Sequence, residues 1–327
     1  MRPRSDLHPS VLVLGGLGDI ARSMTGVMRA RLPEVEVHLA DARASESTGP
    51  SVHQLPSSDD DAYATELRSL VDRLSPGVIL PTNEREIARL SRGDLPSHIA
   101  DRVLLETREH LRVFGDKLLT HDWSIRNGIP AISTLAASRA SEIGFPLLLK
   151  PREGSGGKDQ TVVSDASELT EVRPYLTDAY VVQPYVAAAT EFTCVAARAG
   201  SEIRTLVLER RLHAGRSNWV RVADDEGVTE LTARMAALVK PRHSLNFQFL
   251  RSESGLGLID VNPRFSSTVA MRDALGFTDL VWTIRRAFGM ELPPFEEPRV
   301  GTVVEWADDD GAELVLRDAS PERSPTT

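Results

Sequence analysis

The chain has 327 residues and a mass of 35.8 kDa, a length that favours about two domains with a sizeable apolar core. Hydrophobic residues make up 41% and charged residues 26% of the sequence, which excludes collagen-like, coiled-coil and disordered chains. With 38 basic and 47 acidic side chains the formal net charge is −9, so we expect no general affinity for nucleic acid or for an anionic membrane.

A single cysteine, Cys194, excludes a disulfide framework and any zinc site built from cysteine thiolates. It lies in the apolar stretch 192–197, so we expect a buried structural thiol rather than a nucleophile. No apolar run approaches the roughly 20 residues of a membrane span, and the N-terminal residues lack the apolar core of a signal peptide. We therefore expect a cytoplasmic protein.

The first third of the chain alternates short apolar runs with helical spacing. Four runs predict strands, at residues 11–14, 35–40, 77–80 and 103–105. With the helical pattern of residues 20–32 between the first two runs, this order favours a parallel sheet with right-handed crossovers. Ligands on such sheets bind beyond the carboxyl ends of the strands, where we expect Gly15, Asp41 and Thr82. The polar segment 48–61 predicts a surface loop.

The rest of the chain has a different pattern. A helix is expected over residues 116–127, because Gly128 and Pro130 follow it. Further expected elements are strands at residues 145–151, 160–163, 181–183, 191–199, 203–211, 246–250 and 258–262, and helices at 165–175 and 280–288. The tail beyond Trp306 is acidic and then rich in serine and proline, and we expect it to be frayed.

A glycine-rich turn follows the first predicted strand. Gly15, Gly16 and Gly18, with Asp41 where a ribose-binding acid would stand, are similar to a dinucleotide-binding turn, although the spacing departs from the usual pattern. The alternative is that these glycines permit a tight connection between a strand and a helix. The turn taken alone therefore leaves nicotinamide binding open.

A second glycine cluster, residues 150–158, joins two predicted strands. The backbone N–H groups of such a loop can close over phosphates, and Lys150 adds a fixed positive charge at the end of an apolar strand. Lys117 is a second candidate phosphate contact. The alternative is a flexible hairpin loop with solvated lysines, which leaves the position of Lys150 unexplained.

Two neighbouring predicted strands carry oxygen-bearing side chains. Asp260 and Asn262 are two residues apart and share one face of a strand, and Gln248 lies on its neighbour. Such oxygens suit Mg²⁺ when nucleotide phosphates complete the coordination shell. Arg264 would stand beside the metal and neutralise charge on a transferred phosphoryl group. The alternative is a turn at a sheet edge, with Arg264 in water.

Residues 181–186 predict a strand that leads into a short connector. The exposed backbone groups of such a connector, around Gln183, Tyr185 and Val186, can bind the edge of an adenine. The carboxylate of Glu191, a few residues further on, can hold ribose hydroxyls. The alternative is an ordinary strand and turn.

In this order the four clusters resemble an ATP-grasp enzyme of the carbamoyl-phosphate-synthase-like branch, over residues 11–288. The resemblance implies a mixed α/β and α+β fold, with a Rossmann-like pre-ATP-grasp domain at residues 1–112 followed by a two-lobed ATP-grasp domain. The small lobe would span residues 113–184 and the large lobe residues 185–306, with a flexible tail at 307–327. The N-terminal glycine turn then requires no nicotinamide.

The resemblance also implies roles for single residues. Lys117 and Lys150 would bind ATP phosphates, and Lys150 and Arg264 would be catalytic. The loop that covers the phosphates would contain Gly154, Ser155, Gly156 and Gly157. Contacts to adenine and ribose would come from Gln183, Tyr185, Val186 and Glu191. The Mg²⁺ ligands, for one or two ions with Mn²⁺ able to substitute, would be Gln248, Asp260 and Asn262.

Two positions depart from the family pattern. Many members have glutamate where Gln183 stands, but an amide oxygen can still accept a hydrogen bond from the adenine amino group. Many also have glutamate at the position of Asp260, whose side chain is one methylene shorter. The number of bound metal ions therefore stays open.

The family reaction joins a carboxylate to an amine through an acyl phosphate and releases ADP and phosphate. Arg210 and Arg211, with Arg216 and Arg221 nearby, suit bidentate contact with a carboxylate substrate; the alternative is that they face solvent. We expect a ligase that acts on amino acids or small peptides, with a homodimer as one assembly open to it. The competing hypotheses are a catalytically silent nucleotide-binding protein and, with less support, an NAD(P)-dependent oxidoreductase.

Overall fold

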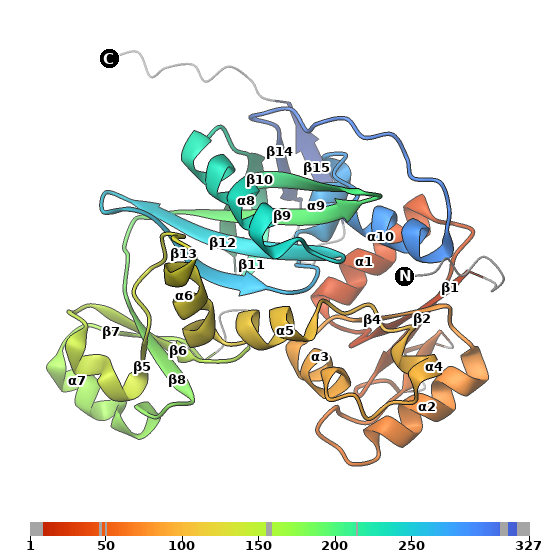
Figure 1. Ribbon diagram of the computed structural model, residues 1–327, viewed down its shortest axis with the longest axis horizontal. Coiled ribbons are helices and arrows are strands. Elements are labelled where there is room, and N and C mark those ends of the chain that lie inside the picture. Colours follow the sequence, from red (N-terminus) through yellow and green to blue (C-terminus); the bar gives the residue numbers. More distant parts are fainter. Residues whose placement is uncertain are drawn as a thin grey trace.

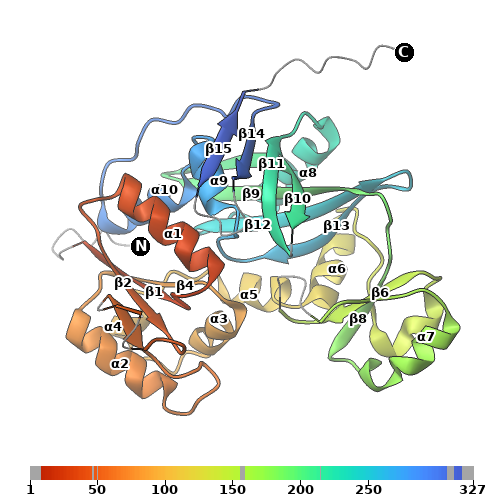
Figure 2. The ribbon, with the colours of Figure 1, turned by 180° about the vertical axis from the view of Figure 1, so that it is seen from behind.

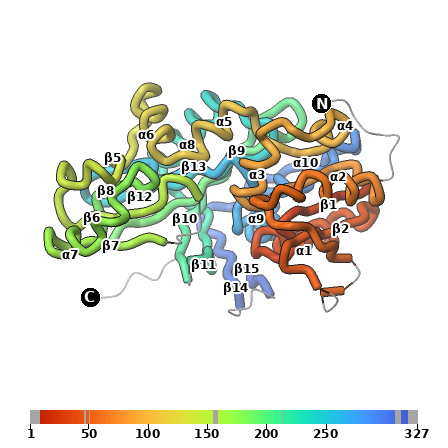
Figure 3. The backbone as a smooth tube through the Cα atoms, turned by 90° about the horizontal axis from the view of Figure 1, so that it is seen from below, coloured from red at the N-terminus to blue at the C-terminus, as the bar shows by residue number. Residues whose placement is uncertain are grey.

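The computed structural model describes residues 9–45, 48–49, 51–154, 159–213, 215–307 and 313–318, which form three sheets with helices packed against them (Figure 1). A first domain (red to orange) and a small lobe (yellow to green) lie at opposite ends of the molecule, below a large sheet in the view of Figure 1. Figure 3 shows the same separation from another side. The expected mixed α/β class is confirmed.

The first domain contains the parallel sheet that its alternating strands and helices predict. The strands lie in the order β3-β2-β1-β4 and are Ser10–Leu14 (β1), Glu36–Asp41 (β2), Val52–Gln54 (β3) and Val78–Pro81 (β4). The helices of this domain are Asp19–Arg31 (α1), Tyr63–Leu74 (α2), Glu84–Ser91 (α3) and Ser97–Ala100 (α4).

Two details of this sheet differ from the expectation. The segment 48–61, expected to be a loop, contains β3, whose 3 residues are too few to show an apolar alternation. The run 103–105 is not a strand, because it joins the sheet through an isolated bridge between Ile79 and Val103.

The small lobe is an antiparallel sheet in the order β5-β8-β6-β7. Its strands are Leu135–Ala136 (β5), Leu147–Pro151 (β6), Thr161–Val163 (β7) and Tyr180–Pro184 (β8). Its helical segments are Ala137–Glu142 (η2), Ala166–Glu171 (α7) and Arg173–Tyr175 (η3). The helix expected at 165–175 is divided, because Pro174 has no N–H group with which to continue α-helical bonding. The helices Arg108–Phe114 (α5) and Lys117–Arg126 (α6) lead from the first domain into this lobe.

The large lobe is a seven-stranded antiparallel sheet in the order β13-β12-β9-β10-β11-β14-β15. Its strands are Thr190–Ala199 (β9), Glu202–His213 (β10), Arg216–Val222 (β11), Ser244–Ser252 (β12), Gly255–Asn262 (β13), Val303–Trp306 (β14) and Leu314–Arg317 (β15). Helix Glu226–Val239 (α8) covers one face, and helices Val269–Ala274 (α9) and Asp279–Phe288 (α10) pack on the other. The tail expected to be frayed therefore contains a strand, β15, which pairs with β14.

The first domain and the large lobe share an apolar core. Val13 and Met24, from β1 and α1, belong to one buried cluster with Val281 and Phe288 from α10. Figure 2 shows α1 beside α9 and α10, and these helices contact one another. The small lobe has a separate core, which is centred on Leu147, Leu149, Val163 and Val182.

Candidate nucleotide-binding and catalytic site

One face of the large sheet carries five of the predicted polar residues. Cross-strand pairing places Glu191 opposite Arg210 and Gln248 opposite Asp260, and Asn262 follows two residues after Asp260. The other face holds the apolar core beneath α8, which includes Phe192, Cys194, Phe247 and Val261. Because side chains alternate along a strand, the polar groups share the face turned away from α8.

A β-bulge in β13 brings Asp260 to this face. Gln248 pairs with Asp260, but Phe249 pairs with Leu258, so that Ile259 is an extra residue in the ladder. Leu258 lies in the core beneath α8, and in a regular strand Asp260 would point the same way. The bulge reverses the alternation at this point and turns the carboxylate toward the candidate site.

A pair of buried lysines lies on the small-lobe side, and one of them, Lys150, is close to this face. Lys150 on β6 is 4% exposed, and Lys117 at the start of α6 is 8% exposed. Burial lowers the pKa of Lys150 to about 8, opposed by the carboxylates of Asp260 and Glu191 and assisted by the charge of Lys117. The structure therefore brings Lys150 together with acidic residues of the other lobe.

Residues at the start of α6 bind the segment that follows β6 through an ion pair and hydrogen bonds. Asp116 caps α6 and also pairs with Arg152 at 2.7 Å. The backbone N–H of Lys117 donates to the carbonyl oxygen of Arg152 at 3.0 Å, and its Nζ donates to the carbonyl oxygen of Gly154 at 2.6 Å. Gly154 has a φ of +95°, in the region that favours glycine. The predicted loop residues Ser155, Gly156 and Gly157 lie outside the described residues.

Gln183 is buried on β8, where its amide nitrogen donates to the hydroxyl oxygen of Thr134 at 2.8 Å. Thr134 is a contact that no sequence motif indicates. Tyr185 is exposed and Val186 is half-buried on the connector between β8 and β9. The backbone N–H of Tyr185 donates to the carbonyl oxygen of Pro146 at 2.9 Å, so this group of the connector is already used within the small lobe.

Arg264 donates hydrogen bonds to Glu84 of the first domain and to two groups of its own turn. Its Nε and Nη2 both donate to Glu84 of α3, the former at 2.6 Å. Nη1 donates to the carbonyl oxygen of Phe265 at 2.7 Å, and Nη2 also donates to the side-chain oxygen of Asn262 at 3.1 Å. Glu84 is a member of the site that the sequence motifs do not indicate.

The two arginines expected to bind a carboxylate substrate lie on different faces. Arg210 forms an ion pair with Glu191 on the site face. Arg211 is the next residue on the same strand, and its guanidinium stacks on Trp219 at 4.3 Å from the ring centroid. The expectation for Arg211 is therefore wrong, because adjacent residues of a strand point to opposite faces. Arg221 pairs with Glu209 on the Arg211 side.

The glycine-rich turn of the first domain uses its amide groups internally. The N–H of Gly16 donates to the carbonyl oxygen of Ala40 at 2.9 Å, and the N–H of Gly18 donates to the carbonyl oxygen of Gly15 at 2.9 Å. The N–H of Leu17 donates to the carboxylate of Asp41 at 3.0 Å. Asp41 also accepts hydrogen bonds from Arg43. A dinucleotide-binding turn instead directs such amides at a pyrophosphate. This geometry disfavours the oxidoreductase hypothesis.

A buried carboxyl lies beside the same turn. Glu86 of α3 is 7% exposed, and burial raises its pKa to about 7 even though Tyr63 and Asn83 donate hydrogen bonds to it. A Cβ added to Gly15 would lie 2.7 Å from the side-chain nitrogen of Asn83 and 2.8 Å from the hydroxyl of Thr82. The turn therefore packs directly on the first residues after β4.

The predicted metal ligands form an oxygen-donor set with one carboxylate. Asp260 would supply the charge and Gln248 an amide oxygen, whereas the side-chain oxygen of Asn262 accepts a hydrogen bond from Arg264. Within the described ranges no group of three or more His, Cys, Asp or Glu residues is arranged to hold a metal ion. A hard cation such as Mg²⁺, which keeps water and phosphate oxygens among its ligands, fits this donor set.

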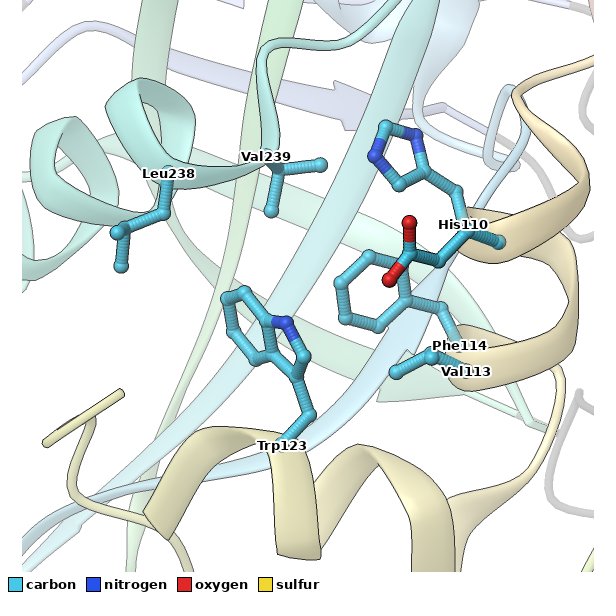
Figure 4. A pocket seen from close by; sticks show the side chains of 7 residues that line it. His110, Val113, Phe114, Trp123, Leu238 and Val239 are labelled. Atoms are coloured by element: carbon cyan, nitrogen blue, oxygen red, sulfur yellow. The ribbon is translucent and has the colours of Figure 1, made fainter. Parts of the chain in front are cut away.

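A hollow between α5, α6 and the end of α8 lies apart from these residues (Figure 4). Its lining consists of Glu109, His110, Val113, Phe114, Trp123, Leu238 and Val239. Trp123 packs edge-on against Phe114, with 5.2 Å between the ring centroids. The hollow shares no residue with the predicted site.

Two further expectations concern the thiol of Cys194 and membrane-spanning segments. Cys194 is fully buried, and burial raises the pKa of its thiol to about 12, which agrees with a structural thiol. In the part of the chain that the structure describes, no helix combines the length and the apolar character needed to cross a bilayer.

A parallel first domain, a small antiparallel lobe and a large antiparallel sheet together make the ATP-grasp fold. The structure of N5-carboxyaminoimidazole synthetase from Staphylococcus aureus, complexed with ADP, matches with a TM-score of 0.74 at 15% identity and covers 93% of this chain and 83% of that one. Carboxyaminoimidazole ribonucleotide synthase from Aspergillus clavatus, complexed with ATP, matches with a TM-score of 0.71 at 16% identity and covers 91% and 81%.

Sequence comparisons agree with the fold. Formate-dependent phosphoribosylglycinamide formyltransferase of Thioalkalivibrio sulfidiphilus is 28% identical over 52% of this chain and 44% of its own length. The carbamoyl phosphate synthase large chain of Clostridium perfringens is 27% identical over 45% of this chain and 14% of its own length. The chain thus spans less than half the length of these relatives. A family described as ATP-grasp in the biosynthetic pathway with Ter operon matches residues 177–309. The chain thus has the ATP-grasp fold, and residues 177–309 are similar in sequence to an ATP-grasp family.

Proposed function

We propose that the chain is an ATP-dependent carboxylate–amine ligase that forms an amide or peptide bond through an acyl phosphate. The observation that carries the proposal is that Lys150, with Lys117 near it, lies close to Glu191 and Asp260 on the large sheet. Buried cations beside oxygen ligands for a metal suit a polyphosphate that brings its own Mg²⁺. The named relatives, which include a formyltransferase and carbamoyl phosphate synthase, support small-molecule substrates.

In this proposal each element of the site has one task. Lys117 and Lys150 bind the phosphates of ATP, beneath the loop of Gly154, Ser155, Gly156 and Gly157. Gln183, Tyr185 and Val186 contact the adenine, and Glu191 contacts the ribose. Gln248, Asp260 and Asn262 would hold Mg²⁺, which supplies charge neutralisation for the phosphates when it is bound.

The chemistry needs two displacement steps. A carboxylate oxygen of the first substrate attacks the γ-phosphorus of ATP, and the bond from that phosphorus to the bridging oxygen breaks to release ADP. The amine of the second substrate then attacks the acyl carbon, the carbon–oxygen bond to phosphate breaks, and the amine loses its proton. Arg264 stabilises negative charge at the transferred phosphoryl group, and Arg210 binds the carboxylate substrate. We propose amino acids or small peptides as the substrates and the cytoplasm as the site of action.

The test is to measure ADP and phosphate release from Mg²⁺-ATP with amino acids offered singly and in pairs. Release that depends on one particular pair, with an amide product detected by mass spectrometry, would support the proposal and identify both substrates. Reduction or oxidation of a nicotinamide cofactor, without nucleotide hydrolysis, would overturn it.

A catalytically silent nucleotide-binding protein is the second candidate, and the presence of one carboxylate among the three metal ligands favours it. The substitution Asp260→Asn separates the two. If the wild-type protein turns over ATP and the variant does not, Asp260 belongs to a working site. If both bind ATP with equal affinity and neither turns it over with any pair, the silent function stands.

A further inference from the structure

Arg264 is fully occupied by groups of its own chain. Its side chain is 8% exposed, whereas its ion-pair partner Glu84 is 33% exposed. The two residues are 180 positions apart in the sequence and come from the large lobe and from α3 of the first domain. Glu84 is the first helical residue after the cap Asn83, so its carboxylate is presented from the edge of the first domain.

The guanidinium of Arg264 has two further hydrogen-bond acceptors besides Glu84. Nη1 is fixed by the carbonyl oxygen of Phe265 at 2.7 Å, and Nη2 is fixed by Asn262 at 3.1 Å. What Glu84 supplies in addition is a negative charge, which a nearly buried guanidinium requires from some partner. Of the two charged groups, Glu84 is the more exposed and can exchange its contact with Arg264 for contact with water.

We propose that Glu84 is a displaceable counter-ion that holds the place of an anionic substrate group on Arg264. When an oxyanion enters the site, whether a substrate carboxylate or a transferred phosphoryl group, it takes over the contact with Arg264 and Glu84 moves to solvent. The proposal rests on the proposed function of this site. It makes Glu84 a residue that sets the affinity of the site for anions.

The experiment titrates two probes, inorganic phosphate and acetate, separately into the full-length protein and measures affinity by calorimetry. We expect Glu84→Gln to bind one or both probes at least about ten-fold more tightly than the wild type, because the competing carboxylate is absent. The probe that responds shows which source of oxyanion the site accepts. Glu84→Asp keeps a negative charge, but at a greater distance from Arg264. Its affinity for the probes should lie between those of the wild type and Glu84→Gln. The matched control is Glu34→Gln. Glu34 also forms an ion pair between the first domain and the large lobe, with Arg285 at 3.3 Å, but this pair does not involve Arg264. The control should bind like the wild type.

The effect of Glu84→Gln on the affinity for the probes must depend on Arg264. In an Arg264→Gln background, Glu84→Gln should leave affinity for both probes unchanged. Equal or weaker binding by Glu84→Gln, a gain that persists without Arg264, or no binding of either probe to any variant would each overturn the proposal. These titrations contain no nucleotide, so a failure to bind ATP, measured separately, would count against the proposed function and not against the role of Glu84.

Discussion

Arg210 and Glu191 lie directly opposite one another on β10 and β9, and their side chains form an ion pair on the site face of the large sheet. The pair links the residue proposed to hold the ribose with the residue proposed to bind a carboxylate substrate. Each therefore fixes the position of the other before any ligand binds.

Replacing Arg210 with glutamine should weaken ATP binding by about three- to ten-fold, since Glu191 loses the charge-assisted contact that holds it. Isothermal titration with Mg²⁺-ATP measures the effect. Arg211→Gln is the matched control and should bind ATP like the wild type, because Arg211 stacks on Trp219 on the other face. Equal weakening by both substitutions would show that the face assignment is wrong.

The affinity for ATP should depend on pH through Lys150. Because burial lowers its pKa to about 8, Lys150 is increasingly neutral above this pH, and the attraction for phosphates falls as the pH rises through about 8. Binding near this pH should also take up protons, which calorimetry in buffers of different ionisation enthalpy detects. Lys150→Arg should remove this dependence, because arginine stays charged. Lys150→Ala should bind ATP at least about ten-fold more weakly at neutral pH.

Arg264→Gln should leave the dissociation constant for ATP nearly unchanged and lower kcat by about 10²- to 10³-fold, as expected when a group that stabilises transition-state charge is lost. Steady-state kinetics with the substrate pair, combined with a separate binding measurement, separates the two quantities. A normal kcat would remove Arg264 from the mechanism.

Glu86 should make the first domain less stable as the pH rises. Its pKa is about 7 in the folded protein and 4.5 in an unperturbed side chain, so the native state holds a proton that the unfolded chain releases between these values. Protonated Glu86 therefore contributes its full stability below pH 4.5, the pKa of the unfolded chain. This contribution, on the order of 3 kcal/mol, is lost as the pH rises through the folded-state pKa of about 7. Urea unfolding at several pH values measures the slope. Glu86→Gln does not titrate and should flatten the profile; an unchanged slope would assign the dependence elsewhere.

Two glycines of the first domain should respond in opposite directions to alanine. Gly15 has a φ of +65°, and an added Cβ would approach Asn83 within 2.7 Å, so Gly15→Ala should cost about 1–3 kcal/mol of unfolding free energy. Gly26 lies in α1 with no atom within 4 Å of an added Cβ, so Gly26→Ala should stabilise by about 0.5–1 kcal/mol. Thermal unfolding compares both with the wild type, and the same sign for both would contradict the packing described for the turn.

The sequence was sufficient for the strands whose apolar residues alternate with polar ones. The strands β9, β10, β12 and β13 are all expected from this pattern, and so is the position of Gln248 on the neighbour of the strand that carries Asp260. The same alternation also shows why Arg210 and Arg211 cannot both reach one site. Elements without such a pattern, such as the short β3 and β15, were missed because pairing with a neighbour stabilises them more than their own composition does.

The contacts that join distant segments were beyond prediction from sequence. The pair of Arg264 with Glu84 depends on how the first domain docks on the large lobe, and no local pattern encodes that docking. The hydrogen bond between Gln183 and Thr134 likewise depends on the pairing of β5 with β8. The bulge at Ile259 leaves no recognisable signature in the sequence.

The apolar cluster that α1 shares with α10 has a mechanical consequence. The first domain and the large lobe share one apolar core that contains Val13, Met24, Val281 and Phe288. A rotation of one part relative to the other would therefore disrupt this packing. The small lobe has a core of its own, and it is connected to the rest of the chain by the segment after α6 and by the connector after β8. Lys150 and Asp260 therefore belong to parts of the chain with separate cores, and their proximity depends on how these two parts pack against each other.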